Sequence, residues 1–224
     1  MNTSGKIGSC YSFDGSDDFI SLESTALYST IQGSTHPFSI AFWVYHADSS
    51  RAVLFGDYSL PGGINFNIEL SAAHAVRFYW AGSPDKYLSG VVATSGWTHV
   101  AMVYDCTDLK YYKDGVLSDT YTVTLAQKNK TSGVYYLGRD YRTGSTALNG
   151  RLNDFRIYDH ALSPLEVKYL AQGLVLHYPL NRGGFGGDNL VLDSVNKTRS
   201  HLESGNEYID INLGNSYMDL PSGT

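Results

Sequence analysis

Short runs of alternating apolar and polar residues, separated by turn residues, fill the first 160 positions of the chain. Such runs predict β-strands with one buried face. Residues 38–45 are apolar on both faces and predict a central strand, and residues 97–104 predict another strong one. Further strands are predicted at residues 11–15, 19–22, 52–55, 64–70, 75–80, 87–92, 109–113, 116–117, 121–125 and 134–137.

Residues 148–158 predict a closing strand whose alternation changes phase. Leu152, Phe155 and Ile157 supply apolar side chains, and polar residues lie between them. The phase changes near Asn153 and Asp154, as it does where a strand contains a bulge.

A capped helix is predicted directly after this strand. Ser163 offers a side-chain oxygen to the first free amides, and Pro164 fits the first helical position. Glu166 stands where the carboxylate of a capping box belongs. The helix is expected to run from Pro164 to about Gln172, with Gly173 as the residue that ends it.

About a dozen short strands with one convincing helix favour an all-β fold, an antiparallel sandwich of two sheets. This domain is predicted to occupy residues 1–173. Residues 174–224 contain strands predicted at 174–178 and 208–213, and a glycine-rich linker lies between them. They are either the start of a second module or a tail packed on the first domain.

Composition narrows the class of partner. The formal net charge is -6, and no cluster of Lys and Arg is present, which argues against a nucleic-acid partner. No apolar run approaches the roughly 20 residues needed to span a bilayer, and the N-terminus has no apolar signal-peptide segment. Cys10 and Cys106 are predicted to be free, mostly buried thiols, with a disulfide between them as the less favoured alternative.

Four ordered motifs together resemble the concanavalin A-like, laminin G-like jelly-roll domain over residues 5–172. They are residues 11–15 with 18–20, residues 38–44, residues 97–101 with 112–115, and residues 137–139 leading to the closing strand and helix. The resemblance implies a two-sheet jelly roll. It does not imply one function, because this fold hosts lectins, adhesion modules, glycosidases and virion proteins.

One departure from the family pattern concerns residues 173–181. A segment of this kind often opens domains of the family, whereas here it follows the domain. Either a second module begins at Gly173, or this C-terminal strand takes the position in the fold that an N-terminal strand usually takes in the family. The arrangement resembles that of phage tail and surface proteins and of gut-bacterial surface proteins, and it implies a fragment of a longer modular chain.

Catalysis is not expected. Glucanases of this fold carry paired glutamates on one strand face, and retaining chemistry needs two carboxyls about 5 Å apart. None of the five glutamates stands in such a pattern. His99 has no serine or cysteine motif near it, so it is predicted to be a hydrogen-bonded structural histidine.

A structural calcium ion is a prediction of the resemblance. In related jelly rolls, the aspartate of a strand like the closing one resembles a calcium ligand, which points to Asp154. Asp14, in the turn after the first strand, is its proposed partner, and Asp17 and Asp18 could join. The alternative stays open: Asp14 caps its own turn, and Asp154 accepts hydrogen bonds at a bulge.

Two aromatic loops are candidates for saccharide binding, which needs a stacking ring and planar polar groups. Tyr79, Trp80 and Tyr87 surround one loop, and Arg139 and Tyr141 belong to the other. For Trp80 the alternative is that it ends a strand and packs into the sandwich. The other two tryptophans, Trp43 and Trp97, are predicted to be core residues because they lie in the strongest strands.

The most favoured function is therefore a non-catalytic carbohydrate-binding or adhesion module of a larger protein. The resemblance points to a phage tail or virion, or to an extracellular or cell-surface setting, with a glycan or cell-surface receptor as partner. The first alternative is a spacer or decoration domain that contacts other subunits or modules of its assembly. The second is a fragment of a glycan hydrolase whose catalytic domain lies elsewhere.

Overall fold

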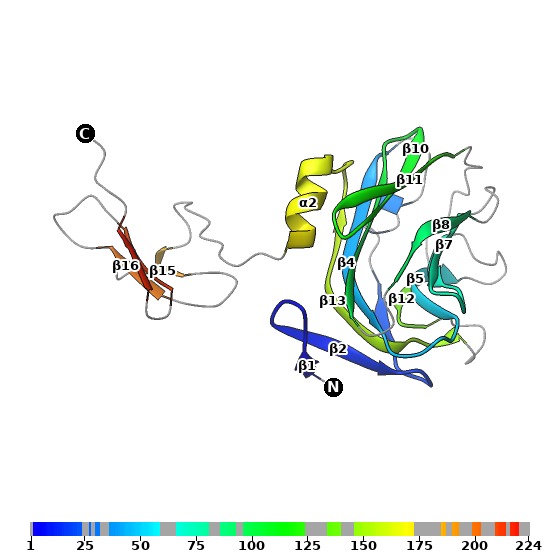
Figure 1. Cartoon of the computed structure of the whole chain (residues 1–224), viewed down its shortest axis with the longest axis horizontal. Coiled ribbons are helices and arrows are strands. Elements are labelled where there is room, and N and C mark those ends of the chain that lie inside the picture. Colours follow the sequence, from blue (N-terminus) through cyan, green and yellow to red (C-terminus); the bar gives the residue numbers. More distant parts are fainter. Residues whose placement is uncertain are drawn as a thin grey trace. The chain divides into compact units, whose positions relative to one another are not determined.

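The computed structural model describes residues 2–23, 27, 30–31, 36–58, 66–80, 86–92, 96–123, 134–139, 146–172, 185–186, 190–192, 199–202, 209–213 and 216–219. The chain divides into two compact units, Met1–Gly173 and Leu174–Thr224. The first unit contains two antiparallel sheets that face each other (Figure 1). This arrangement confirms the predicted two-sheet sandwich.

One sheet of the first unit has seven strands, and its centre is built from the strongest predicted strands. Its order is β1 (Asn2–Ser4), β2 (Ser9–Asp14), β13 (Asn149–Tyr158), β4 (Phe38–His46), β9 (Trp97–Tyr104), β10 (Asp108–Lys113) and β11 (Val116–Thr122). The closing strand β13 lies between β2 and β4, so chain segments distant in sequence form the middle of the sheet. Residues 116–122 form one continuous strand, where the sequence predicted two short ones.

The other sheet has six strands. Its order is β3 (Ile20–Leu22), β12 (Val134–Leu137), β5 (Ala52–Tyr58), β6 (Phe66–Leu70), β7 (Ala75–Trp80) and β8 (Lys86–Val91). Helical conformation at Leu27, Thr30 and Ile31, between β3 and β4, was not predicted from the sequence.

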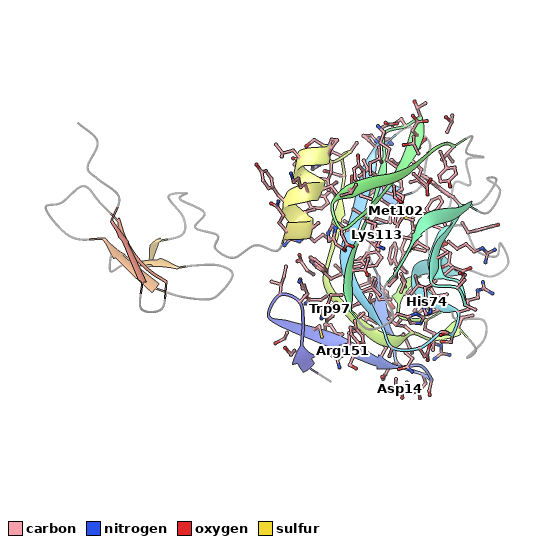
Figure 2. The ribbon with its side chains drawn as sticks, in the orientation of Figure 1. Asp14, His74, Trp97, Met102, Lys113 and Arg151 are labelled. Atoms are coloured by element: carbon pink, nitrogen blue, oxygen red, sulfur yellow. The ribbon has the colours of Figure 1, made fainter. Side chains whose placement is uncertain are left out.

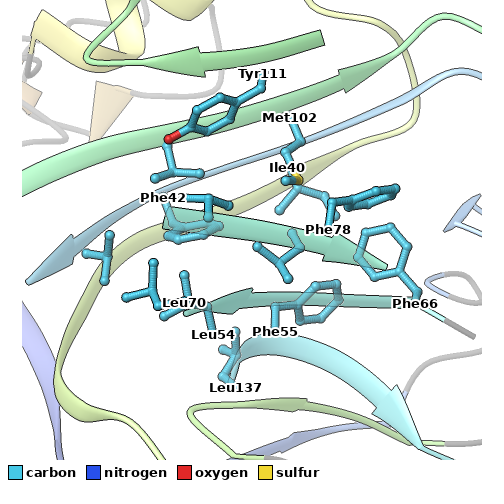
Figure 3. Close-up of a cluster of buried hydrophobic side chains, with 14 of the residues drawn as sticks. Ile40, Phe42, Leu54, Phe55, Phe66, Leu70, Phe78, Met102, Tyr111 and Leu137 are labelled. Carbon is cyan, nitrogen blue, oxygen red and sulfur yellow. The ribbon is translucent and has the colours of Figure 1, made fainter. Parts of the chain in front are cut away.

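Apolar side chains from the inner faces of both sheets form one core (Figure 3). Aromatic rings contact one another within it: Phe66 meets the rings of Phe38, Phe55, Phe78 and Trp80 at centroid distances between 5.2 and 6.0 Å. These are edge-to-face contacts, the arrangement that ring quadrupoles favour. Residues of both sheets belong to this one cluster, so the core joins the two sheets.

Helix α2 (Pro164–Gln172) covers the outer face of the seven-stranded sheet (Figure 1). Its Val167, together with Leu162, packs on Ala41, Ala101 and Val103, and Tyr112 also belongs to this cluster. The helix has the bounds predicted from the sequence. Small alanines on the sheet let the helix approach closely.

The capping box predicted at the start of α2 is confirmed. The carboxylate of Glu166 accepts a hydrogen bond from the backbone N–H of Ser163 at 2.7 Å, and the Glu166 N–H donates to Ser163 Oγ at 3.3 Å. Both contacts satisfy amides that the first turn of a helix leaves without partners.

Replacing Ser163 by alanine is expected to lower the free energy of unfolding of the first unit by about 1 kcal/mol, the usual cost of an N-cap. Urea unfolding followed by tryptophan fluorescence measures it, because Trp43, Trp80 and Trp97 all lie in the first unit. Ser163→Asp, which also caps helices, should restore most of the loss. An unchanged midpoint in Ser163→Ala would contradict this role.

The phase change predicted in the closing strand is a bulge. Pairing of β13 with β4 shifts register between Asn153 and Arg156, and Asp154 has a φ of 51°. Asn153, 6% exposed, donates through Nδ2 to the backbone oxygens of Ile7 and Ser9, at 3.1 and 2.9 Å. The bulge therefore fastens the turn that joins β1 and β2 to the sheet.

Both cysteines are free, as the sequence predicted: Cys10 is buried and Cys106 is half-buried. Burial raises the pKa of Cys10, although the nearby Arg151 opposes the shift.

The second unit contains a five-stranded antiparallel sheet. Its strands are β14 (Phe185–Gly186), β15 (Leu190–Leu192), β16 (Arg199–Leu202), β17 (Ile209–Leu213) and β18 (Ser216–Asp219). β17 overlaps the strand predicted at residues 208–213, and the strand predicted at 174–178 lies outside the described residues. Within the described residues, no helix is long and apolar enough to cross a membrane.

Candidate ligand-binding site

The outer face of the six-stranded sheet carries an unusual set of buried polar residues. In β6, Phe66, Ile68 and Leu70 belong to the core, so strand alternation directs Asn67 and Glu69 to the outer face. Asn67 is only 4% exposed and Glu69 only 1%. Buried polar groups cost free energy unless they are paired, so such a face needs a structural or functional reason.

Glu69 is the centre of this face. Its Oε2 accepts hydrogen bonds from Arg51 Nη2 at 2.8 Å and from Asn67 Nδ2 at 3.1 Å, and its Oε1 accepts from Arg77 Nη1. The register of β6 and β7 places Arg77 directly opposite Glu69. The arginine side chains remain 46% (Arg51) and 19% (Arg77) exposed, so the cluster presents cationic edges to solvent.

Two tyrosines lie on either side of this cluster in one row across the sheet. Register pairs Tyr136 with Gly56, Gly56 with Asn67, and Asn67 with Tyr79. Neighbouring strands lie about 4.8 Å apart, so the two tyrosine Cα atoms are separated by roughly 14 Å. Both tyrosines are half-buried, which leaves part of each side chain accessible.

Gly56 makes room for the amide in this row. A Cβ atom at Gly56 would lie 2.3 Å from Asn67 Oδ1, far inside contact distance. The glycine therefore lets the Asn67 side chain lie over the neighbouring strand.

An exposed aromatic extends the row at the sheet edge. Phe19 is 47% exposed, and its ring meets the ring of Tyr136 edge-on at a centroid distance of 5.8 Å. The guanidinium of Arg139 lies 5.2 Å from the Phe19 ring centroid, and its Nη1 donates to Asp17 O at 3.5 Å. We call Asn67, Glu69, Arg77, Tyr79 and Tyr136, with Phe19 and Arg139 at the edge, the polar face.

The residues predicted to bind saccharide do not all lie on the polar face. Tyr79 and Arg139 belong to the polar face. Trp80 is 6% exposed and packs against Phe38 at a ring distance of 5.3 Å. Since β7 directs alternate side chains inward, Trp80 points into the core, which corrects the prediction that it stacks on a ligand. Register pairs Tyr87 with Arg77, but the Tyr87 side chain, like all of Tyr141, lies outside the described residues.

The two aspartates predicted to share a calcium ion lie apart. Asp14 pairs with Asn149 across β2 and β13, and Asp154 follows Asn149 by five residues. At about 3.4 Å per residue, five residues of strand separate them by roughly 17 Å, whereas calcium ligands lie about 2.4 Å from the ion. The pair therefore does not fit one ion.

Each aspartate has a local role, as the alternative reading expected. Asp14 Oδ1 accepts the Ser16 N–H at 2.8 Å and closes its turn, at the lower end of the first unit in Figure 2. Asp154 pairs with Arg156 Nε at 2.8 Å beside the bulge, on the lining of a cavity of about 360 Å³. The carboxylates of Asp14, Asp17 and Asp18 do lie within 4.8 Å of one another, and calcium binding stays a prediction.

His99 is a buried structural residue, 2% exposed, with its ring edge-on to Trp43 at 5.2 Å. Its backbone exchanges hydrogen bonds with Asp114, both at 2.9 Å, but within the described residues its Nδ1 has no hydrogen-bond partner. The prediction of a hydrogen-bonded histidine therefore holds for the backbone of His99 and not for its Nδ1. Trp97 is half-buried, so its prediction as a core residue is also corrected, whereas Trp43 is buried, at 4% exposed.

Sequence reasoning missed Phe19, Asn67, Glu69, Arg77 and Tyr136 as one group. The alternation in residues 66–70 does place Asn67 and Glu69 on one face. What the sequence does not give is the strand order, which brings residues from five strands or their flanking turns into one row.

A sequence profile of the concanavalin A-like lectin/glucanases superfamily matches residues 14–168. The chain belongs to this superfamily. The match spans the sandwich from the end of β2 into helix α2, and it confirms the concanavalin A-like, laminin G-like resemblance. No curated protein sequence matches this member of the superfamily.

Solved structures share the fold of this superfamily member. Domain 4 of AbnA, a GH43 extracellular arabinanase from Geobacillus stearothermophilus solved with arabinotriose, has a TM-score of 0.60 and 23% identity, over 76% of this chain and 80% of that one. A heptameric SAP-like pentraxin from Limulus polyphemus has a TM-score of 0.52 and 16% identity, over 62% and 72%. Trypanosoma rangeli sialidase with sialic acid has a TM-score of 0.58 and 14% identity, over 76% of this chain and 28% of the sialidase. At these identities the similarity concerns the fold.

Proposed function

We propose that the first unit is a non-catalytic carbohydrate-binding module and that the polar face binds the glycan. The observation that carries the proposal is the row in which two half-buried tyrosines flank a buried amide and a Glu69–arginine cluster. Aromatic rings stack on the C–H faces of sugars, and amide, carboxylate and guanidinium groups hydrogen-bond to hydroxyls.

The charges of the polar face favour binding over hydrolysis. Of the residues that define it, Glu69 alone carries a carboxylate, and two arginines and an amide already occupy its oxygens. A retaining mechanism needs a second carboxyl about 5 Å away, and an inverting one needs it roughly 6.5 to 9.5 Å away.

The first probe is an arabino-oligosaccharide, because arabinotriose accompanies the AbnA domain in its structure. A glycan array extends the search to other sugars. Tyr79→Ala and Tyr136→Ala are each expected to weaken binding about threefold to tenfold, since one aromatic contact contributes about 0.5 to 1.5 kcal/mol. Isothermal titration of the full chain measures the change.

Tyr169→Ala is the matched control, because Tyr169 is 60% exposed and lies on helix α2, which covers the other sheet. It should bind as the wild type does. Absence of binding to every glycan at high protein concentration would refute the proposal, and so would equal losses in Tyr169→Ala and the two polar-face variants.

The setting of the module remains a prediction from sequence. An extracellular or cell-surface location fits a glycan-binding role, and a phage tail or virion is the narrower expectation. The second compact unit is consistent with a modular parent protein, in which neighbouring modules would be further partners.

A further inference from the structure

Two histidines from different sheets meet at one end of the sandwich. His46 is the last residue of β4, in the seven-stranded sheet, and His74 lies in the turn between β6 and β7, in the six-stranded sheet. Their Nδ1 atoms lie 3.1 Å apart, and their rings are inclined at 68° with centroids 5.2 Å apart. Figure 2 labels His74 on the side of the six-stranded sheet.

An aspartate lies beside the ring nitrogen of the buried histidine that does not face His74. His46 is fully buried, and its Nε2 lies 3.3 Å from Asp48 Oδ1. Asp48 is itself held in place, because Asn149 Nδ2 donates to its Oδ2 at 2.8 Å and Ser50 N–H donates to its Oδ1 at 2.8 Å. This contact does not have hydrogen-bond geometry, since Nε2 of His46 has no hydrogen-bond partner among the described residues. The charge of the nearby carboxylate still favours hydrogen on Nε2, which leaves the Nδ1 lone pair directed at His74.

The turn presents His74 from the solvent side. His74 is half-buried and has a φ of 59°, a left-handed conformation that non-glycine residues seldom adopt. Its N–H donates to Ser71 O at 2.9 Å, and its carbonyl accepts the Val92 N–H at 3.0 Å. These bonds hold the backbone of the turn in place, and the half-buried ring of His74 leaves part of the pair accessible.

We propose that His46 and His74 bind one divalent transition-metal ion of the zinc type through their Nδ1 atoms, with Asp48 orienting His46 from behind. Two nitrogens on one tetrahedral ion, each at about 2.05 Å, lie about 3.4 Å apart, so a small separation of the rings admits the ion. Water from the exposed side of His74 completes the coordination.

The donor set selects the class of ion. Imidazole nitrogens suit zinc, copper and nickel, whereas calcium prefers six to eight oxygens. Without metal, His74 supplies the Nδ1 hydrogen that joins the rings. On binding, that hydrogen moves to Nε2 of His74.

Zinc binding to the full chain, measured by equilibrium dialysis, tests the proposal. The wild type is expected to bind one ion at this site, and calcium is expected not to compete. His74→Asn removes a ligand but suits the backbone, because asparagine tolerates the left-handed conformation better than most residues. Asp48→Asn should lower the zinc affinity about 10- to 100-fold, the usual effect of losing an outer-shell partner. His74→Asn should lower the zinc affinity further, because it removes a ligand.

Two readouts separate this site from zinc held elsewhere on the surface. His160→Asn, which changes an exposed histidine paired with Asp159, should bind zinc as the wild type does. In nitrogen NMR spectra, zinc should shift the Nδ1 signals of His46 and His74 together and leave the Nε2–H of His46 in place. Absence of zinc binding, binding that is unchanged in His74→Asn, or coordination through Nε2 would each overturn the proposal.

A bound ion would also link the two sheets. Zinc should then raise the melting temperature of the wild type, because an ion that binds only the folded state stabilises it, and should leave that of His74→Asn unchanged. A rise of equal size in both proteins would contradict the bridge between sheets.

Discussion

Replacing Glu69 by alanine is expected to lower the free energy of unfolding of the first unit by about 3 to 5 kcal/mol, the usual cost of breaking a buried ion pair. Glu69 is 1% exposed, and its carboxylate accepts hydrogen bonds from Arg51, Arg77 and Asn67. Alanine would leave the Asn67 amide and the mostly buried Arg77 guanidinium without this acceptor. Urea unfolding followed by tryptophan fluorescence measures the change.

Glu69→Gln separates the charge from the shape, because glutamine keeps the side-chain length and one carbonyl acceptor. It should cost less than alanine and still weaken glycan binding. Asp159→Ala is the surface control, since the Asp159 side chain is 87% exposed in its pair with His160, and it should change the unfolding midpoint little. A Glu69→Ala protein as stable as the wild type would show that the cluster contributes no stability.

The consequence for binding follows from the same contacts. A carboxylate fixed by three donors cannot reorient, so Arg51 and Arg77 keep their positions before a ligand arrives. Polar groups that are already ordered lose less conformational entropy when they bind a ligand. In the proposed glycan complex, the ion pairs that keep the polar face folded would therefore also give it specificity.

Strand periods in the sequence predicted the architecture well, because hydrophobic alternation is a local property. The same alternation shows why the Trp80 prediction failed. Val76, Phe78 and Trp80 lie on the inner side of β7. The alternation of this strand therefore predicts the direction of the Trp80 side chain better than the aromatic loop that follows it. Tyr79, one position earlier, lies on the opposite face.

Contacts between strands depend on register and order, which the sequence does not express. Arg77 faces Glu69 across neighbouring strands, but the row from Tyr136 to Tyr79 requires β12 to lie beside β5. His46 and His74 are 28 residues apart and belong to different sheets. Their meeting depends on how the sandwich closes, so no spacing rule could have found it.

Acid is expected to destabilise the first unit through His99. Burial, which outweighs the attraction of Asp114 and Asp154, lowers the pKa of His99 from 6.5 to about 4. Between these values the unfolded chain binds a proton that the folded one does not, so stability falls as the pH drops from 6.5 and levels off below about 4. The shift corresponds to about 3 kcal/mol.

His99→Gln, which has no group titrating in this range, should remove that part of the pH dependence. The comparison is between slopes, because the buried amide changes the stability at neutral pH as well. Burial also lowers the pKa of His46, so a smaller loss of the same sign should persist in the variant. Urea midpoints measured by tryptophan fluorescence across this pH range give both slopes, and parallel slopes in the two proteins would exclude His99 as the source. Since Nδ1 of His99 has no hydrogen-bond partner among the described residues, only the attraction of Asp114 and Asp154 favours the charged ring, and burial outweighs it.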